Sequence, residues 1–217
     1  MKTITRKELT EIIRPGSSAM IGGFLGCGTP DEIIDELIVS RIGGLTVIAN
    51  DTAFPDRGIG RLVVNRLVSR AIVSHIGTNP ETQRQMIEGE IEVELVPQGT
   101  LAERVRARGV GLGGILTPTG VGTVVEEGKE TLVVGEQKYL LELPISAEFA
   151  FIKAKRADYC GNLSYSLTAR NFNPLMAMAA ECVIAEVEEV VPVGSISPEE
   201  IHTPGVIVDY ILVRGCR

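Results

Sequence analysis

A dense run of glycines between an apolar strand and a helix is the feature that most restricts how this chain can fold. Apolar residues 19–21 lead directly into residues 22–28, where four of the seven residues are glycine. Glycine adopts positive φ angles and lets a ligand approach the main chain without meeting a Cβ atom. Beyond this glycine loop (residues 22–28), Thr29 is a good helix N-cap, Pro30 suits the first helical position, and Glu32 completes a capping box. The sequence therefore predicts a sharply defined strand–loop–helix element.

The spacing within the glycine loop excludes two common phosphate-binding motifs. A P-loop spacing runs from Gly23 to Gly28, but Thr29 stands where a P-loop requires its lysine. The dinucleotide-binding pattern G-x-G-x-x-G cannot be placed either, because Thr29-Pro30-Asp31 follows Gly28. In addition, Asp31 and Glu32 bring negative charge to the helix end where a pyrophosphate would bind. The remaining main-chain N–H groups suit a carbonyl, a thioester oxygen or an oxyanion. A tight turn without any ligand is the alternative that the loop alone leaves open.

Composition narrows the class of protein. The 217 residues are 44% hydrophobic and 23% charged, which allows a large core in one domain, or in a domain with a small appendage. A formal net charge of −7 argues against nucleic acid as a partner. The apolar stretches are strand-sized, which argues against a membrane span, and residues 1–3 lead into a charged helix instead of a signal peptide. We therefore expect a cytoplasmic protein.

Cysteine usage agrees with that compartment. Cys27, Cys160, Cys182 and Cys216 are scattered, with no C-x-x-C pair, and the chain has two histidines. Neither a disulfide framework nor a zinc site is indicated by this spacing. We expect no metal.

Apolar periodicity alternates between strand and helix through the first hundred residues. Strands are predicted at 18–21, 45–49, 70–74 and 91–96, and helices at 6–13, 30–40, 60–65, 80–88 and 101–107. Such repeats are typical of an α/β fold with a mostly parallel sheet and flanking helices. Ligands bind beyond the carboxyl ends of the strands in open sheets of this kind. The predicted site therefore lies in four loops, at 22–28, 50–55, 75–79 and 97–100.

The second half of the chain changes character. Segments 109–114 and 117–122 are dense in glycine, and residues 131–134 and 139–143 predict a hairpin across Gly135-Glu136. We expect a glycine-rich, partly β insertion or lid at this point. Strands are then predicted at 149–153, 182–186 and 206–213, with a helix at 174–180, so the chain should return to the same sheet. We interpret residues 1–217 as one continuous domain.

Two sets of residues invite catalytic interpretations. Cys27 lies beside a helix start, where a thiolate is stabilised, and His75 could act as its base. The simpler explanation is that cysteine is a small residue that fits a crowded turn. Glu126 and Glu127 could supply a catalytic carboxylate, but a pair of glutamates before Gly128 more often marks a solvated turn.

Polar residues also follow the predicted strands. Asn50, Asp51, Asn79 and Gln98 each lie in a segment that follows an apolar strand. At such positions a cap that satisfies the loop and a contact to substrate look alike. The pattern alone leaves both interpretations open.

These motifs resemble those of the α subunit of family I CoA-transferases. Gly22-Gly23-Phe24, with Gly28 and Pro30, fits the G-G-F-x-x-x-G-x-P signature of that family. Further matching segments, at 48–52, 76–82, 96–101, 117–123 and 169–174, extend the resemblance over nearly the whole chain. Pro15 departs from the acidic or amide residue usual before Gly16. Since Pro15-Gly16 still makes a turn, we expect a local backbone difference without loss of function.

The resemblance implies an enzyme of the acetate or butyrate:acetoacetate CoA-transferase type. Such enzymes move CoA between a short-chain acyl-CoA and a carboxylate such as acetoacetate, acetate or butyrate, through a glutamyl-CoA thioester. The glutamate is expected in a β subunit, within a Ser-Glu-Asn-Gly-type motif that this chain lacks. The resemblance thus implies a hetero-oligomer with a β subunit, no catalytic nucleophile in this chain, and no cofactor beyond the CoA thioester substrates. The CoA- and substrate-binding residues that it implies are Gly22, Gly23, Phe24, Leu25, Gly26, Cys27, Gly28, Asn50 and Gln98.

Three alternatives stay open beside this interpretation. A subunit of the 3-oxoadipate or succinyl-CoA:3-oxoacid type would share the chemistry but exchange other acids. A self-sufficient cysteine acyltransferase or thioesterase would use Cys27. A non-catalytic effector-binding domain, like those of sugar-phosphate-responsive regulators, is disfavoured because no basic helix-turn-helix segment is found near the N-terminus.

Overall fold

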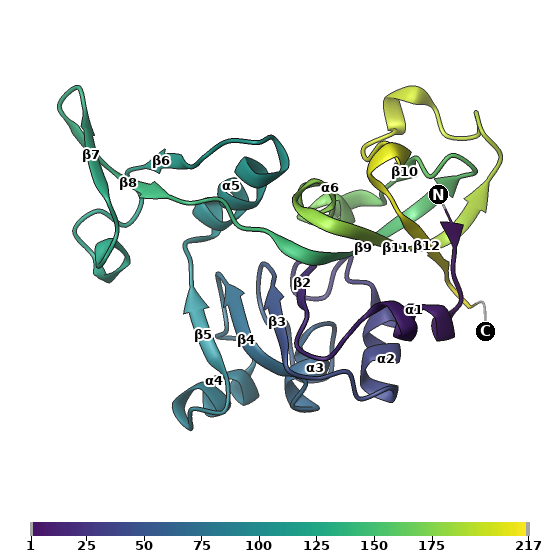
Figure 1. Ribbon diagram of the computed structural model, residues 1–217, viewed down its shortest axis with the longest axis horizontal. Coiled ribbons are helices and arrows are strands. Elements are labelled where there is room, and N and C mark those ends of the chain that lie inside the picture. The colour runs from purple at the N-terminus through teal and green to yellow at the C-terminus, as the bar shows by residue number, and fades with distance from the viewer. Residues whose placement is uncertain (1, 216–217) are drawn as a thin grey trace.

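Strand β2 (Ser18–Ile21) lies in the middle of a nine-stranded, mostly parallel sheet in this computed structural model, which describes residues 2–215. The other strands of this sheet are β1 (Lys2–Thr3), β3 (Leu45–Ile48), β4 (Val68–Val73), β5 (Glu92–Leu95), β9 (Ala147–Asp158), β10 (Leu163–Ser164), β11 (Ala180–Val191) and β12 (Tyr210–Val213). Their order is β1-β12-β11-β9-β2-β3-β4-β5, with β10 antiparallel to β9 (Figure 1). The predicted α/β fold is confirmed, including the return of the last strands to the same sheet.

Six helices cover the two faces of this sheet in the described part of the chain. They are α1 (Arg6–Ile12), α2 (Asp31–Val39), α3 (Gly60–Val64), α4 (Pro80–Ile87), α5 (Gln98–Gly109) and α6 (Asn173–Ala179). Helices α1 to α4 lie on one face and α5 and α6 on the other (Figure 1). No helix among residues 2–215 is long and apolar enough to cross a membrane.

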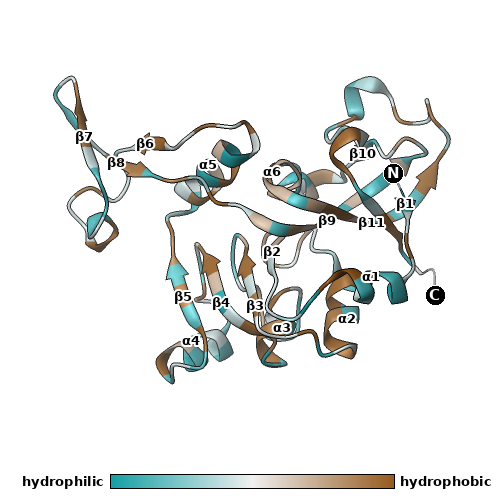
Figure 2. Cartoon of the chain, in the orientation of Figure 1, coloured by the Kyte–Doolittle hydropathy of each residue, from teal (hydrophilic) through white to brown (hydrophobic). Residues whose placement is uncertain are grey.

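Strand β2 shows how the sheet separates two hydrophobic cores. Ala19 and Ile21 belong to the core beneath α1 to α3, whereas Met20 points to the opposite face and joins the core beneath α5 and α6. Side chains alternate between the two faces of a strand, so a strand buried on both faces is apolar throughout. Figure 2 shows this pattern as hydrophobic colour along the central strands and hydrophilic colour on α4.

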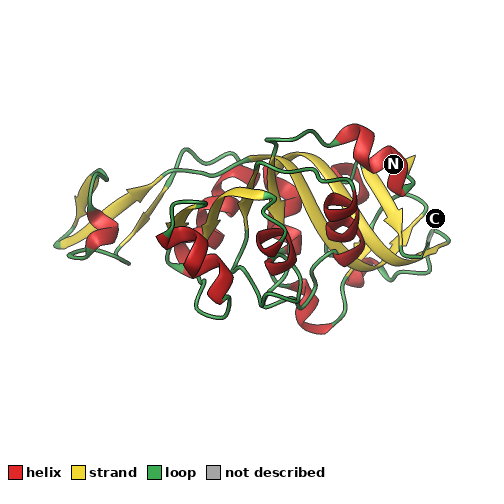
Figure 3. Ribbon diagram, turned by 90° about the horizontal axis from the view of Figure 1, so that it is seen from below, coloured by secondary structure: helices red, strands yellow, loops and turns green. Residues whose placement is uncertain are grey.

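A small antiparallel sheet projects from the main sheet as an arm (residues 115–142). It consists of β6 (Ile115–Thr117), β7 (Thr131–Val134) and β8 (Gln137–Glu142), in the order β6-β8-β7. Figures 1 and 3 both show it extending away from the helices. The predicted hairpin across Gly135-Glu136 is confirmed by the pairing of Val134 with Gln137.

The pair Glu126-Glu127 lies on this arm, at the end of a short 3-10 turn. The Glu126 carboxylate pairs with Lys138, and this hydrogen bond, followed by one from the Gly122 N–H, lowers the pKa of Glu126. These contacts belong to a turn on the surface of the arm, as the sequence pattern favoured.

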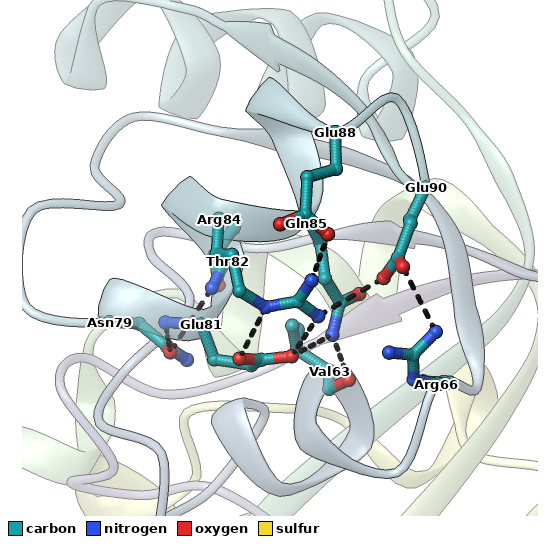
Figure 4. A network of polar contacts seen from close by, with 9 residues as sticks. All are labelled: Val63, Arg66, Asn79, Glu81, Thr82, Arg84, Gln85, Glu88 and Glu90. Atoms are coloured by element: carbon teal, nitrogen blue, oxygen red, sulfur yellow. Dashed lines mark hydrogen bonds and ion pairs between the residues drawn. The ribbon is translucent and has the colours of Figure 1, made fainter.

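Helix α4 shows that one of the polar residues after the strands serves the fold. Asn79 is fully buried, and its Oδ1 accepts hydrogen bonds from the backbone N–H groups of Glu81 (3.2 Å) and Thr82 (3.3 Å), which caps the helix. Its Nδ2 donates to the Thr52 carbonyl at 2.9 Å. Figure 4 shows this cap beside a network of polar contacts centred on Arg84. The hydrogen bond from Arg84 to Glu81, and to a smaller degree that from Gln85, lowers the pKa of Glu81 to about 2.

Several predicted element bounds, and one predicted cap, are wrong. Strands β9 and β11 are each longer than the predicted 149–153 and 182–186. Helix α5 begins at Gln98, three residues before the predicted start, so Gln98 belongs to the first turn of the helix. The predicted strand at 206–213 is shorter, because the N–H of Gly205 donates to Asn162 Oδ1 and residues 205–207 form a 3-10 turn before β12. Helix α2 begins at Asp31 without a side-chain cap from Thr29, so the predicted capping box is absent.

Candidate functional site

The glycine loop lies at the position where the order of strands in the main sheet reverses. Strand β2 pairs with β3 on one side and with β9 on the other, so the chain leaves β2 in one direction and returns on the opposite side. In open α/β sheets a crevice forms outside the carboxyl ends of the strands at such a switch point. The loop that follows β2 therefore stands at the rim of this crevice.

Loops after four neighbouring strands meet in one pocket at this edge of the sheet. The pocket has a volume of about 370 Å³ and is lined by Phe24, Leu25, Asn50, Asp51, Ser74, His75 and Gln98. We call it the strand-end pocket. Of the residues implied by the family resemblance, it brings together Phe24, Leu25, Asn50 and Gln98. Ser74 had no predicted role, although its position directly after β4 could have indicated one.

A row of hydrogen bonds crosses the strand-end pocket. Gln98 Nε2 donates to Asn50 Oδ1 at 2.9 Å, and Asn50 Nδ2 donates to Asp51 Oδ2 at 2.6 Å. The Asn50 backbone is held from the next strand, because the N–H and hydroxyl of Ser74 both donate to its carbonyl oxygen. Asn50 and Asp51 are buried, whereas Gln98 is exposed at the pocket. The row thus runs from a solvent-accessible amide to a buried carboxylate.

The glycine loop is a tight turn that uses several of its own N–H groups. Phe24 and Cys27 exchange two backbone hydrogen bonds, of 3.0 and 2.8 Å, and Leu25 and Gly26 between them have φ angles of +47° and +84°. The Gly22 N–H donates to the Phe151 carbonyl, and the Leu25 N–H donates to Asp51. The predicted cluster of free donors is therefore smaller. Within the described residues, the loop N–H groups without a partner are those of Gly23, Gly26 and Gly28.

The loop glycines are required by packing against the protein itself. A Cβ atom at Gly22 would lie 1.8 Å from Asn173 Oδ1, and one at Gly23 would lie 2.1 Å from the Thr29 hydroxyl. A Cβ atom at Gly28 would meet the Ala169 backbone at 2.8 Å. We expected these positions to face ligand; the structure instead fills them with protein atoms. The Thr29 hydroxyl lies beside Gly23, which explains why it does not cap helix α2.

Asn173 fastens the glycine loop to the opposite half of the sheet. It is fully buried at the start of α6, and its Nδ2 donates to the carbonyls of Gly28 (3.0 Å) and Ala169 (2.7 Å). Its Oδ1 accepts the Lys153 N–H at 3.0 Å. Asn173 falls within a segment that resembles the family, but its sequence position predicted no role. Its contacts identify it as the side chain that fixes the loop.

Cys27 and His75 lie on different sides of the glycine loop. Cys27 Sγ is 3.2 Å from the Thr168 hydroxyl, in a second cavity of about 280 Å³ that Lys153 and Lys155 also line. His75 lines the strand-end pocket. No hydrogen bond joins the two among residues 2–215, so the geometry does not support a Cys27–His75 dyad. Cys216 lies outside the described residues.

Glu186 on β11 takes the capping position that the sequence assigned to Thr29. Its Oε2 accepts the N–H groups of Glu32 (2.7 Å) and Ile33 (3.3 Å) at the start of α2. Lys153 Nζ lies 3.7 Å from its other oxygen, for which residues 2–215 provide no hydrogen-bond partner. Burial raises the pKa of Glu186 to about 7. A glutamate inside an apolar strand was the available signal for this contact.

The strand-end pocket can bind carbonyl or carboxylate oxygen through amide donors. Among the described residues, no three His, Cys, Asp or Glu side chains are arranged to hold a metal ion. The single carboxylate lining the pocket, Asp51, already accepts hydrogen bonds from three donors.

Comparisons with known proteins show which family the chain matches. Residues 3–214 match the family described as coenzyme A transferase. The chain is similar to the acetate CoA-transferase subunit alpha of Escherichia coli K12 (54% identical, covering 98% of this chain and 96% of the relative) and to the acetoacetyl-CoA:acetate/butyrate CoA transferase alpha subunit of Clostridium acetobutylicum (48%, covering 97% of each).

A solved structure extends the comparison to the fold. An acyl-CoA transferase of Escherichia coli O157:H7, solved as a thioester complex with CoA, superposes with a TM-score of 0.86 at 22% identity. The match covers 98% of this chain and 47% of that one, so this chain spans about half of its length. With the family match over residues 3–214 and the two close relatives, the chain belongs to the coenzyme A transferase family.

Proposed function

We propose that this chain is the α subunit of a CoA-transferase that exchanges CoA between a short-chain acyl-CoA and acetoacetate, acetate or butyrate. A β subunit would supply the nucleophilic glutamate and complete the site. The two bacterial relatives, both alpha subunits of nearly the same length, support this proposal. The proposal also includes a cytoplasmic location. The free thiols of Cys27, Cys160 and Cys182 support it, because thiols stay reduced in the cytosol.

The strand-end pocket is the observation that carries the proposal. A carboxylate that attacks a thioester creates an oxyanion, and preorganised N–H donors stabilise such charge. Gln98 presents a side-chain amide at this pocket. The Gly26 N–H, which has no partner in the described part of the chain, lies in the adjoining turn. The Asp51 carboxylate is buried and accepts three hydrogen bonds, so it is poorly suited to act as the nucleophile. A glutamate from the partner would add the missing nucleophile, and covalent catalysis would then divide the exchange into two acyl transfers.

The experiment is a reconstitution of the two subunits. The purified chain, a β subunit of the family and their mixture are each supplied with acetoacetyl-CoA and acetate or butyrate. We expect CoA transfer in the mixture alone. Trapping the mixture with borohydride or hydroxylamine after acyl-CoA is added should modify a glutamate of the partner, which mass spectrometry would locate. Exchange by this chain alone at normal rates, or a modified carboxylate within it, would contradict the subunit assignment.

Variants test whether the strand-end pocket is the site. Gln98→Ala should lower kcat/KM by roughly ten- to a thousandfold, as expected when a donor to developing charge is lost. Gln137→Ala removes the same type of side chain from the arm and serves as the matched control. Equal rates for the two variants would remove Gln98 from the site.

The alternative functions make different predictions. A succinyl-CoA:3-oxoacid or 3-oxoadipate type would prefer a dicarboxylate over acetate and butyrate when both are offered. An effector-binding domain would bind sugar phosphates without transferring CoA. Titration with sugar phosphates and a panel of acceptor acids separates these outcomes.

A further inference from the structure

The Asp51 carboxylate binds two residues in strained backbone conformations, one of which, Leu25, lines the strand-end pocket. Its Oδ2 accepts the Leu25 N–H at 2.9 Å, and its Oδ1 accepts the Ala53 N–H at 2.7 Å. Leu25 and Ala53 have φ angles of +47° and +49°, a region that non-glycine residues rarely occupy. One buried carboxylate thus joins the loop after β2 to the loop after β3.

The same carboxylate decides which way the Asn50 amide faces. Both oxygens of Asp51 act as acceptors toward backbone N–H groups, so the Asn50 group that approaches Oδ2 at 2.6 Å must be its NH₂. The side-chain oxygen of Asn50, Oδ1, then faces Gln98, which must donate to it through Nε2. The direction of every hydrogen bond in the row is therefore fixed from its buried end.

This direction determines what Gln98 offers to the pocket. One Nε2 hydrogen of Gln98 is used by Asn50, and within the described residues the second has no protein partner. We propose that Asp51 is a positioning residue, which acts through Asn50 to hold the Gln98 amide with its second N–H available to the substrate oxygen. The inference rests on the proposed function, because it assigns the donor that would stabilise the oxyanion of CoA transfer.

The loss of this orientation has a specific consequence. Asp51→Asn keeps the shape of the side chain but can turn its own NH₂ toward Asn50. The Asn50 amide can then reverse, and Gln98 would turn its carbonyl oxygen toward Asn50 or lose the contact. A carbonyl oxygen next to a developing oxyanion repels it, whereas an N–H stabilises it. Binding of the acyl-CoA away from this point would change little, so the effect should fall on kcat.

A double-mutant cycle on the reconstituted two-subunit enzyme tests this dependence. Asp51→Asn and Gln98→Ala should each lower kcat by roughly ten- to a thousandfold, with KM changed by less than about threefold. Because Asp51 acts through Gln98, the double variant should be no more than about threefold slower than the slower single variant. A double variant whose loss equals the product of the two single losses would overturn the inference.

A second cycle does not depend on the strained loops. Asn50→Ala breaks the row but leaves both backbone hydrogen bonds of Asp51 in place, so it remains informative if Asp51→Asn fails to assemble. Asn50→Ala should slow the enzyme about as much as Gln98→Ala, and their combination should add less than about threefold. If the kcat losses of Asn50→Ala and Gln98→Ala instead multiply in the double variant, Asn50 does not act through Gln98 and the inference is contradicted.

Controls separate this inference from the proposed function. Asp56→Asn removes an exposed carboxylate from the same inter-strand segment and should keep wild-type kcat. A wild-type complex that transfers no CoA would refute the proposed function. If the complex is functional and Gln98→Ala is slow, but both cycles are additive, the positioning role alone is refuted. If Gln98→Ala keeps the wild-type rate, both the Gln98 donor and the positioning role are refuted.

Discussion

Replacing Glu186 by glutamine should change how the stability of the protein depends on pH. The side chain is fully buried beneath the start of α2, and burial raises its pKa from 4.5 to about 7. The folded protein therefore binds this proton more tightly than the unfolded chain. Its stabilising effect is complete below pH 4.5 and is lost as the pH rises through 7.

The size of the effect follows from the two pKa values. The interval from 4.5 to about 7 corresponds to about 3 kcal/mol, of which about 2 kcal/mol falls between pH 5 and pH 8. Glu186→Gln keeps an oxygen that can accept the Glu32 N–H but cannot ionise. Relative to the variant, the wild-type protein should therefore lose about 2 kcal/mol of unfolding free energy over this range.

Urea unfolding at pH 5, 6, 7 and 8 measures this difference. Glu188→Gln is the matched control, because Glu188 lies two residues further along the same strand and is exposed. The unfolding free energy of Glu188→Gln should change with pH in parallel with that of the wild type. A difference between wild type and Glu186→Gln that stays constant from pH 5 to pH 8, or that changes in the opposite direction, would refute the reasoning.

Two further predictions concern the glycine loop. Gly22→Ala should lower the unfolding free energy by about 2 to 4 kcal/mol in thermal or urea unfolding, because the new methyl group displaces Asn173 and breaks its buried hydrogen bonds. In the control Gly113→Ala, the new methyl group meets no atom of the described residues within 4 Å, so the unfolding free energy should stay within about 0.5 kcal/mol of the wild type. Equal stabilities of the two variants would contradict this role of Asn173. Cys27→Ser should keep kcat/KM of the reconstituted enzyme within about threefold in steady-state assays, because Cys27 faces Thr168 and not the strand-end pocket; complete loss of turnover would revive a cysteine nucleophile.

The strand and helix order could be predicted from sequence because apolar periodicity records burial directly. Strand β2 is apolar on both faces, and its predicted and observed bounds coincide at residues 18–21. The hairpin of the arm was equally visible, since Gly135 allows the tight turn between β7 and β8. Bounds set by distant contacts were not visible. The start of α2 depends on Glu186, more than 150 residues later in the chain.

The meeting of the strand-end loops in one pocket was predictable from sequence, but the hydrogen bonds within the pocket were not. The rule for strand ends placed Asn50 and Gln98 near the glycine loop, and both line one pocket. The sequence could not show that the Asp51 carboxylate binds Leu25 and Ala53, because hydrogen bonds between loops depend on the packing of the whole sheet edge. For the same reason, the loop glycines suggested open space for a ligand where the structure places Asn173 and Thr29.

The anchoring of the glycine loop also sets the time at which it can form during synthesis. Gly22 is bonded to Phe151, Gly28 to Asn173, and the helix after the loop to Glu186. At about 5 to 20 residues per second, the ribosome needs roughly 10 to 30 s to travel from the loop to the last of these partners. Until then the nascent loop can use its own hydrogen bonds and that to Asp51, but it lacks the partners that join it to the second half of the sheet. A fold with so many distant contacts is also expected to form slowly once it is complete, so the first half of the chain emerges well before its site exists.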